Sequence, residues 1–491
     1  MKSGHKLPPL ALALAILLVG ASVVAAQGPS GTYGSGIACT NLSTTTAANL
    51  VISFYAADSS TVVLSYADPT PVPAGASRNY FTPSTPPGLP SAFLGAAVVS
   101  SDQPIACNVN TQVVTAGAGT TTTPARIGTS AGLDSAETGA ALYAPQLFKN
   151  FSSSNWNSYV AVQNTTSSPL TVYVSYVDRF GTAYPAARES FVIPAQTSHV
   201  FYQASNVNLP NNFLGGATIT STGNLAATAN FYNGAANYQN AQLHSYNPVM
   251  AGASTLFVPR FVRNYYGFNS GLSVQNVGAA STSVTVTFTF AGNSYVVNSG
   301  TIVPGGTYSP YAPNISQLAP VDSLGVGVRF GSAVIQAAPG GLVTAIVNED
   351  NRGTCGSASC PGIPANQVGW GSTYNAVPNG DQSPTVFFSQ VTRNVSSAQF
   401  SSGFQITDAS GTGGTCNIQY SGASAANETS VPLAANGSIS RFAPNVANLP
   451  DGFNSSVKVT CTVAVVGIAN LSGRNAAYYG DSMTTANGLN Q

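Results

Sequence analysis

The sequence predicts an all-β protein of four tandem antiparallel β-sandwich units, on three observations. Residues 143–233 consist of short runs of β-branched and aromatic residues, each closed by Asn, Gly, Pro or Ser, which is typical of strands and turns. Two sequence markers repeat along the chain at about the length of one domain. Outside the N-terminus, no segment has sustained helical periodicity.

The two markers keep a nearly constant offset from each other. The first is a turn at residues 72–75, 193–196 and 303–306 that contains proline, and its fourth copy at 433–436 lacks it. The second follows sixteen or seventeen residues later and is usually a Leu-Pro pair. Its prolines are 120, 110 and 130 residues apart, at Pro90, Pro210, Pro320 and Pro450. Two markers with one offset indicate a true repeat.

The markers divide the chain into units joined by polar linkers. The predicted boundaries are residues 33–110, 143–233, 256–348 and 386–470, followed by a polar tail at 471–491. Six or seven short strands in about 90 to 100 residues predict an immunoglobulin-like sandwich for each unit. A four-bladed propeller is the competing architecture, and a β-solenoid would need a much shorter repeat. The linkers share a Tyr-Asn pair at Tyr246 and Tyr374, with an expected echo at residues 478–480.

Residues 1–26 are predicted to be a secretion signal. Lys2 and Lys6 give a basic start, residues 10–19 are apolar, and small residues at 24–26 place the cut after Ala26. An uncleaved anchor is the alternative, although this apolar core is short for a membrane span. No second apolar run of membrane length follows. We therefore expect a secreted protein at the cell surface, without a membrane span after cleavage.

The composition disfavours several classes of partner. Charged residues make up 6% of the chain, against roughly 25% in ordinary domains. Without Lys2 and Lys6, 13 of the 15 basic residues remain against 15 acidic ones. Nucleic acid binding needs clustered Lys and Arg, so no nucleic-acid partner is expected. A nearly neutral surface offers little protection against self-association, which makes further copies or other surface proteins candidate partners.

The six cysteines predict three disulfides. An even number of cysteines behind a secretion signal is typical of a disulfide-bonded extracellular protein. We expect each bridge to lie within one unit or loop. The expected pairs are Cys39–Cys107, Cys355–Cys360 and Cys416–Cys461. A zinc site is disfavoured because no second cysteine pair or histidine lies near residues 355–360.

The pattern resembles the tandem immunoglobulin-like repeats of secreted bacterial surface proteins. The resemblance rests on residues 257–260, residues 273–276 and the Leu-Pro markers, and extends over nearly all of the chain after the signal. It implies a sandwich fold and a surface location, and no particular activity or ligand. Unit 4 departs furthest from the pattern, at residues 405–408.

A catalytic site is not predicted. Residues 128–132 fit the GxSxG pattern around Ser130, but that motif needs a strand before it and a helix after it, and these flanks read as linker. His199 and His244, the histidines after the signal, lie far apart in sequence. A glycosidase would need two carboxylates at one cleft, and the acidic residues are scattered. We expect no cofactor.

Two further groups are candidate binding residues. Glu349 and Asp350 end the last strand of unit 3, where turn carboxylates could hold calcium; a solvated turn is the alternative, and the spacing is not that of an EF-hand. Aromatic residues near the unit boundaries either pack between units or stack on sugars, which would give a carbohydrate-binding array. They are Trp156, Tyr265, Tyr266 and Trp370.

The function expected is that of a non-catalytic structural or adhesive surface protein, a component of a rod, coat or filament; a carbohydrate-binding array and a secreted hydrolase are the alternatives. Units 2 to 4 each begin with an apolar lead-in, at residues 143–148, 256–262 and 386–391, and unit 1 has none. We therefore expect unit 1 to accept a strand from another chain, in head-to-tail assembly. The alternative is a smaller sandwich with its edge covered by its own linker.

Overall fold

The computed structural model describes residues 12–15, 31–59, 61–91, 93–233, 239, 241–355, 358–360 and 363–490. These residues form antiparallel strands joined by turns, and the predicted all-β class with antiparallel β-sandwiches is confirmed. The strands are grouped below by unit. None of the helices described is long and apolar enough to cross a membrane.

Units 1 and 3 each pair a five-stranded sheet with a four-stranded sheet. The strands of unit 1 are β1 (Leu12–Ala15), β2 (Tyr33–Asn41), β3 (Leu50–Ala56), β4 (Val62–Ala67), β5 (Ser77–Phe81), β6 (Gly95–Ser101), β7 (Ile105–Val113), β8 (Ile127–Ala131) and β9 (Leu133–Asp134). Those of unit 3 are β17 (Thr255–Val262), β18 (Phe268–Asn276), β19 (Val284–Phe290), β20 (Asn293–Asn298), β21 (Thr307–Tyr308), β22 (Phe330–Ala337), β23 (Val343–Asn351), β26 (Gly371–Asn375) and β27 (Val377–Pro378), with a small hairpin of β24 (Thr354–Cys355) and β25 (Ala358–Ser359).

In units 2 and 4, one long strand belongs to both sheets. β15 (Phe213–Asn233) pairs with β10 and β12 mainly through its first half and with β11 and β16 through its second half. The other strands of unit 2 are β10 (Gly139–Lys149), β11 (Trp156–Asn164), β12 (Leu170–Asp178), β13 (Glu189–Ile193), β14 (Ser198–Tyr202) and β16 (Leu243–Tyr246). Unit 4 consists of β28 (Ser383–Thr392), β29 (Phe400–Asp408), β30 (Gly414–Tyr420), β31 (Glu428–Leu433), β32 (Ser438–Phe442), β33 (Asn454–Gly473), β34 (Met483–Asn487) and β35 (Leu489–Asn490).

Short 3₁₀ turns connect some of the strands. They are η1 (Ser135–Glu137), η2 (Pro185–Ala187), η3 (Gln203–Ser205), η5 (Ala312–Asn314), η6 (Ser316–Ser323), η7 (Val326–Val328), η8 (Ala365–Gln367), η9 (Ser424–Ala426) and η10 (Ala443–Asn445). η1 has a capping box, in which the Asp134 side chain accepts from the backbone N–H of Ala136 and Glu137 while the Glu137 side chain accepts from that of Asp134.

Each sandwich has its own apolar core between its sheets. β19 shows how the sequence builds it: buried residues alternate with half-buried threonines along Val284–Phe290, as expected for a strand with one face in the core. Phe288 and Phe290 are fully buried and pack with Phe261 and Ile335 of neighbouring strands. Burying such a side chain contributes roughly 1.5–3 kcal/mol, so the alternation fixes which face of the sheet turns inward.

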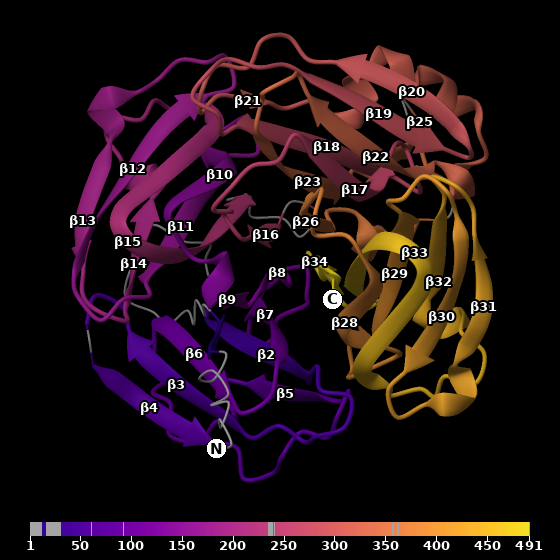
Figure 1. Cartoon of the computed structure of the whole chain (residues 1–491), viewed down its shortest axis with the longest axis horizontal. Coiled ribbons are helices and arrows are strands. Elements are labelled where there is room, and N and C mark those ends of the chain that lie inside the picture. Colours follow the sequence, from indigo (N-terminus) through magenta and orange to yellow (C-terminus); the bar gives the residue numbers. More distant parts are fainter. Residues whose placement is uncertain are drawn as a thin grey trace, which may run out of the picture.

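The four sandwiches form a closed ring, so they do not follow one another as a rod (Figure 1). The chain runs once around the ring, and unit 4 ends beside unit 1. The two are joined by hydrogen bonds such as Ser77 Oγ to the Ser389 carbonyl, at 2.8 Å. At the centre of the ring lie β8, β16, β26 and β34. All four come from stretches expected to be polar linkers or tail, and all are strands.

Unit 1 has a first strand in the full chain, contrary to expectation. β1 pairs antiparallel with β6 and with β9 and so completes the five-stranded sheet. Its residues, Leu12–Ala15, come from the segment expected to be the secretion signal. The rest of that expected signal, and the first residues after the expected cleavage site, lie outside the described residues.

The structure contains the three disulfides, each within its own unit or loop. Cys39 and Cys107 face each other on β2 and β7, with Cα atoms 4.1 Å apart. Cys416 and Cys461 face each other on β30 and β33 at 4.0 Å. Both bridges therefore join neighbouring strands of one sheet, whereas antibody domains bridge two sheets.

Replacing Cys39 and Cys107 together with alanine should destabilise the protein more than replacing Cys355 and Cys360. The first bridge spans 68 residues and the second spans 5. In the loop-entropy model these correspond to about 4 and about 2 kcal/mol. Thermal unfolding of both double variants, monitored by circular dichroism, measures the difference. Equal melting temperatures would contradict the assignment of Cys39–Cys107 as the principal constraint on unit 1.

Candidate functional site

The four central strands, β8, β16, β26 and β34, are called the hub. Each lies beside a strand of its own unit in which an asparagine faces a serine or threonine of the hub strand. These asparagines recur at steps of 120, 118 and 122 residues: Asn110, Asn230, Asn348 and Asn470. The facing hydroxyl residues are Thr129, Ser245, Thr373 and Thr485. The first three donate to the amide oxygen of their asparagine.

Asparagine side chains also join the hub strands to one another. Asn247 accepts from the Ala131 N–H at 2.9 Å and donates to the Ala131 carbonyl at 3.1 Å. Asn487 makes the same pair of bonds to the backbone of Asn375, at 3.1 and 2.7 Å. Asn375 in turn donates to the Asn247 carbonyl at 2.8 Å. Polar backbone that would otherwise be unpaired inside the ring is thereby satisfied by amides.

A buried carboxyl adds further hub contacts. Asp481 is fully buried and accepts from the backbone N–H of Leu243 at 3.2 Å and of Gly371 at 2.9 Å. It thereby connects units 2, 3 and 4. Burial raises the pKa of Asp481 well above the usual range of an aspartate.

His244, on the hub strand β16, is also a buried titratable group. It is 2% exposed, stacks on Phe231 and places Nδ1 2.9 Å from Thr373 Oγ1. Burial lowers the pKa of His244 to about 3, so the ring is neutral at physiological pH. Its contacts connect β16 with β26, which is a structural role.

Three of the four junctions between units share one type of contact. The carbonyl of a residue in the first strand of one unit accepts from a hydroxyl of the next: Pro145 from Ser273 at 2.8 Å, and Pro259 from Thr407 at 2.9 Å. The junction of unit 4 with unit 1 repeats it, because the Ser389 carbonyl accepts from Ser77. The cavity at this junction, about 20 Å³, has room for a water molecule and not for a ligand.

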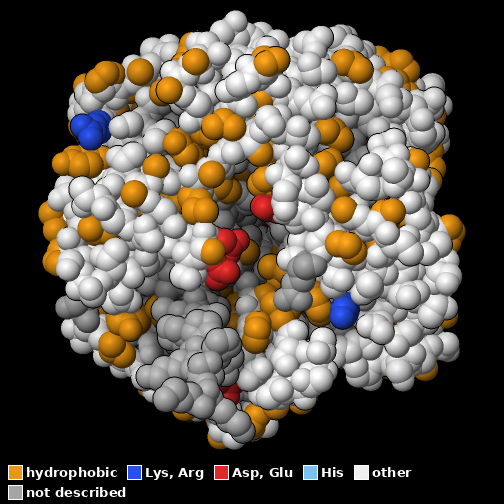
Figure 2. Space-filling view, viewed as in Figure 1, with side chains coloured by type: hydrophobic (Ala, Val, Ile, Leu, Met, Phe, Trp, Pro, Cys, Tyr) orange, Lys and Arg blue, Asp and Glu red, His pale blue; other side chains and the backbone are white. Residues whose placement is uncertain are grey.

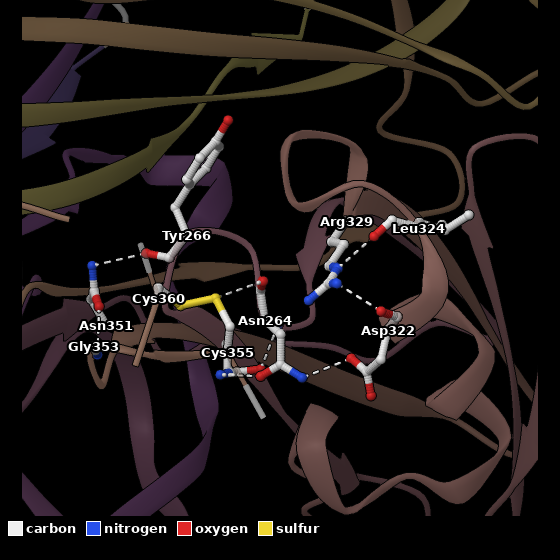
Figure 3. Close-up of a disulfide and its surroundings, with 10 residues drawn as sticks. Asn264, Tyr266, Asp322, Leu324, Arg329, Asn351, Gly353, Cys355 and Cys360 are labelled. Carbon is white, nitrogen blue, oxygen red and sulfur yellow. Dashed lines mark hydrogen bonds between the residues drawn. A yellow bond between two sulfur atoms is a disulfide. The ribbon is translucent and has the colours of Figure 1, made fainter. Parts of the chain in front are cut away.

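A larger polar cavity of about 490 Å³ lies in unit 3. Arg263 is buried in its wall and donates to Asp322 Oδ2 at 2.7 Å and to the backbone carbonyl of Ile315 at 3.2 Å. Asn264 donates to Asp322 Oδ1 at 2.7 Å, and Arg329 holds the carbonyl of Asp322 at 2.6 Å (Figure 3). Burial opposes ionisation of Asp322, but the hydrogen bonds from Arg263 and Asn264 keep its pKa below the usual range.

This group of residues is a repeated clamp. In each of units 2 to 4, a basic residue and an asparagine end the first strand and bind the loop around the second marker. The clamp pairs are Lys149 with Asn150, Arg263 with Asn264, and Arg393 with Asn394. In unit 2, Lys149 donates to the carbonyl of Leu209 at 2.8 Å. In unit 4, Asp451 accepts from both clamp residues at 2.8 Å. In units 2 to 4, the second marker thus lies in or beside the loop segment that the clamp binds.

Unit 3 adds a disulfide loop to the wall of the cavity. Cys355–Cys360 closes the β24–β25 hairpin, and Cys355 Sγ lies 3.6 Å from the Asn264 carbonyl (Figure 3). At the base of the loop, Asn351 accepts from the Gly353 N–H at 2.8 Å. Arg352 and Thr354, both from this segment, also line the cavity.

The two candidate calcium ligands are engaged with arginines. Glu349 accepts from Arg260 through both carboxylate oxygens, each at 2.9 Å. Asp350 pairs with Arg352 and accepts from the Tyr311 hydroxyl at 3.2 Å. Among the residues described, no three His, Cys, Asp or Glu side chains are grouped as metal ligands. The carboxylates therefore do not fit a calcium site.

The GxSxG residues lie in the hub. Residues 128–131 belong to β8, and Ser130 is 7% exposed. A two-residue strand and a 3₁₀ turn follow, where the hydrolase elbow needs a helix. His199 lies 2.7 Å from Asp58 at the junction of units 1 and 2, and His244 contacts Thr373. The structure thus gives Ser130 the environment of a packed strand residue.

The four singled-out aromatic residues lie in different environments. Trp156 packs on Phe148, Phe231 and His244 in the core of unit 2. Trp370 is 1% exposed. Tyr265 is half-buried, and its ring contacts that of Tyr266, which is 42% exposed. Among these four, Tyr266 alone presents a large part of its ring to solvent.

No protein-family model matches the chain, and no curated protein matches it. Among solved structures, the pilus backbone RrgB from Streptococcus pneumoniae is 9% identical, over 78% of this chain and 86% of that protein, with a TM-score of 0.10. The pilus adhesin SpaC from Lactobacillus rhamnosus GG is 11% identical, over 92% of this chain and 55% of the adhesin, with a TM-score of 0.10. Superpositions this poor carry no argument about function.

Replacing Asn247 with alanine should destabilise the hub. The substitution leaves the N–H and carbonyl of Ala131 without their amide partner, which costs roughly 1–3 kcal/mol for a buried group. Chemical denaturation of Asn247→Ala beside wild type measures the loss. The exposed Asn293 serves as a matched control, since Asn293→Ala should change stability by less than about 0.5 kcal/mol. Equal effects of the two variants would contradict the role given to the hub amides.

Acid should destabilise the protein partly through His244. Its pKa of about 3 in the fold lies below the unfolded value of about 6.5, so stability falls as the pH drops between these values, by up to about 1.4 kcal/mol per pH unit. The raised pKa of Asp481 has the opposite effect on stability, but Asp481 is present in both wild type and His244→Gln, so its effect cancels in the comparison. Unfolding free energies of wild type and His244→Gln from pH 7 to 4 should therefore converge. Parallel curves would contradict the buried neutral imidazole.

Proposed function

We propose that the protein is a secreted, non-catalytic structural or adhesive component of the cell surface. The observation that carries the proposal is the closed ring, in which the junction of units 4 and 1 has the same hydroxyl-to-carbonyl contact as the junctions of units 2 and 3 and of units 3 and 4. A ring joined by a polar hub, in which three of the units carry an internal disulfide, suits a rigid platform. Its buried Asp481 and His244 contribute to holding units 2, 3 and 4 together.

The surface composition supports the same role. On the face shown in Figure 2, Lys and Arg side chains are sparse, and acidic side chains gather in the central hollow. The rest of that face is backbone, uncharged polar side chains and scattered hydrophobic side chains, in line with a charged fraction of 6%. A surface with little charge gives weak electrostatic resistance to association, which suits a subunit of a coat or an adhesive layer.

Carbohydrate binding is the second candidate, and the unit 3 cavity favours it. Its volume of about 490 Å³ lies in the range of small-molecule sites, roughly 300–1,000 Å³, and its lining is rich in hydrogen-bonding groups. Tyr266, which contacts Tyr265 in the same unit, offers an aromatic surface. The clamp bonds of Arg263 and Asp322 already occupy much of that lining, so the structural role remains the main proposal.

Negative-stain microscopy of the secreted protein tests the main proposal. We expect ring-shaped particles that associate with one another as concentration rises; extended rods, or rings that stay strictly single at high concentration, would contradict it. A glycan array with the same preparation separates the second candidate. Glycan binding that Tyr266→Ala abolishes and Tyr295→Ala preserves would favour carbohydrate recognition, because Tyr295 belongs to the outer strand β20 of the same unit.

A further inference from the structure

In units 3 and 4 the first strand is held between two neighbouring strands. β17 pairs with β22 and β27, and β28 pairs with β33 and β35. β1 occupies the same position between β6 and β9. Both neighbours give the same alignment: Leu14 faces Val98 and Leu133, as Phe257 faces Val334 and Val377. Two independent registers thus place β1 as the equivalent of the first strands of the other units.

The position occupied by β1 is called the unit 1 slot. Its two walls are the backbone edges of β6 and β9. Ala97 and Val99 of β6 belong to the core of unit 1. Val98 and Leu133 pack instead with Ala226 of unit 2. The slot is therefore lined mainly by aliphatic residues, with Asp134 at the end of β9 as the one charged residue of these two strands, and it touches the junction between units 1 and 2.

Secretion would empty this slot. Leu12–Ala15 lie inside the segment expected to be removed by cleavage after Ala26, so the processed chain would start at Gln27. β6 would then lose one partner, and β9 would lose the one strand with which it pairs among the described residues. Two unpaired edges facing each other form a template for an extended segment.

We propose that the slot of the processed protein binds a strand donated by a different polypeptide. The donor is an extended segment of at least four small or aliphatic uncharged residues, antiparallel to both β6 and β9, as Leu12–Ala15 is. This inference gives the proposed surface function a partner and rests on the secretion that function implies.

A second copy of the processed chain is a poor donor. The equivalent strands β10, β17 and β28 are paired within their own units, and the C-terminal strands β34 and β35 complete unit 4. The ten residues after the expected cleavage site, QGPSGTYGSG, are mostly glycine and small polar residues. The donor therefore comes from another protein, and the head-to-tail assembly expected from the sequence is replaced by this pairing.

The experiment uses the chain from residue 27 to 491 and a synthetic peptide of residues 10–18, LALALAILL, with a solubilising lysine tail and a fluorophore. We expect saturable one-to-one binding by fluorescence anisotropy and a melting temperature that rises with peptide concentration. A peptide with Leu14→Pro should bind at least about tenfold more weakly, since proline lacks the N–H of a strand residue.

The chain that retains residues 1–26 is the matched control, because its slot is already occupied. It should bind the peptide at least about tenfold more weakly than the processed chain, and unfold at a higher temperature without peptide. Three results would overturn the proposal: no binding to the processed chain, equal binding of the proline peptide, or mass spectrometry showing that the secreted protein keeps Leu12–Ala15. If the processed chain forms ring-shaped particles but does not bind the peptide, the slot proposal is wrong and the proposed structural function is unaffected.

Discussion

The architecture depends on the pairing of buried backbone at the hub. Short polar strands from the ends of the four units meet at one place, where water cannot satisfy every N–H and carbonyl. The side-chain amides of Asn247 and Asn487 take the place of a paired strand. Each accepts from the N–H and donates to the carbonyl of one residue of the neighbouring hub strand. Without these amides, the N–H and carbonyl groups of Ala131 and Asn375 would lose the partners that join neighbouring hub strands.

Ring closure follows from the same constraint. Each unit contributes one strand to the hub, and three of the four junctions further out share a hydroxyl-to-carbonyl contact. The Ser389 carbonyl accepts from unit 1 as Pro145 accepts from unit 3, although different residue types supply the carbonyl. Because a backbone acceptor makes the contact, the sequence can vary there while the geometry is kept.

The sandwiches could be predicted from the sequence because their signals are local. The alternation along Val284–Phe290 and the recurring turn and Leu-Pro markers report strands and repeats directly. The hub could not be predicted, since strands such as Gly371–Asn375 are short and polar and become strands only through partners far away in the chain. The Tyr-Asn pairs at residues 246–247 and 374–375 indicated part of the hub. Its fourth copy is Ala486–Asn487 and not the Tyr478 segment, because the asparagine makes the contact between hub strands.

Unit 1 departs from the repeat in two linked ways, and both concern missing partners. Where the other hub strands carry Asn247, Asn375 and Asn487, unit 1 has Ala131, which receives amide bonds and supplies none. In units 2 to 4, a clamp of a basic residue and an asparagine lies at the end of the first strand. In unit 1, the first strand is Leu12–Ala15, from the segment expected to be the secretion signal. Unit 1 thus differs from the other three units at both its hub strand and its first strand.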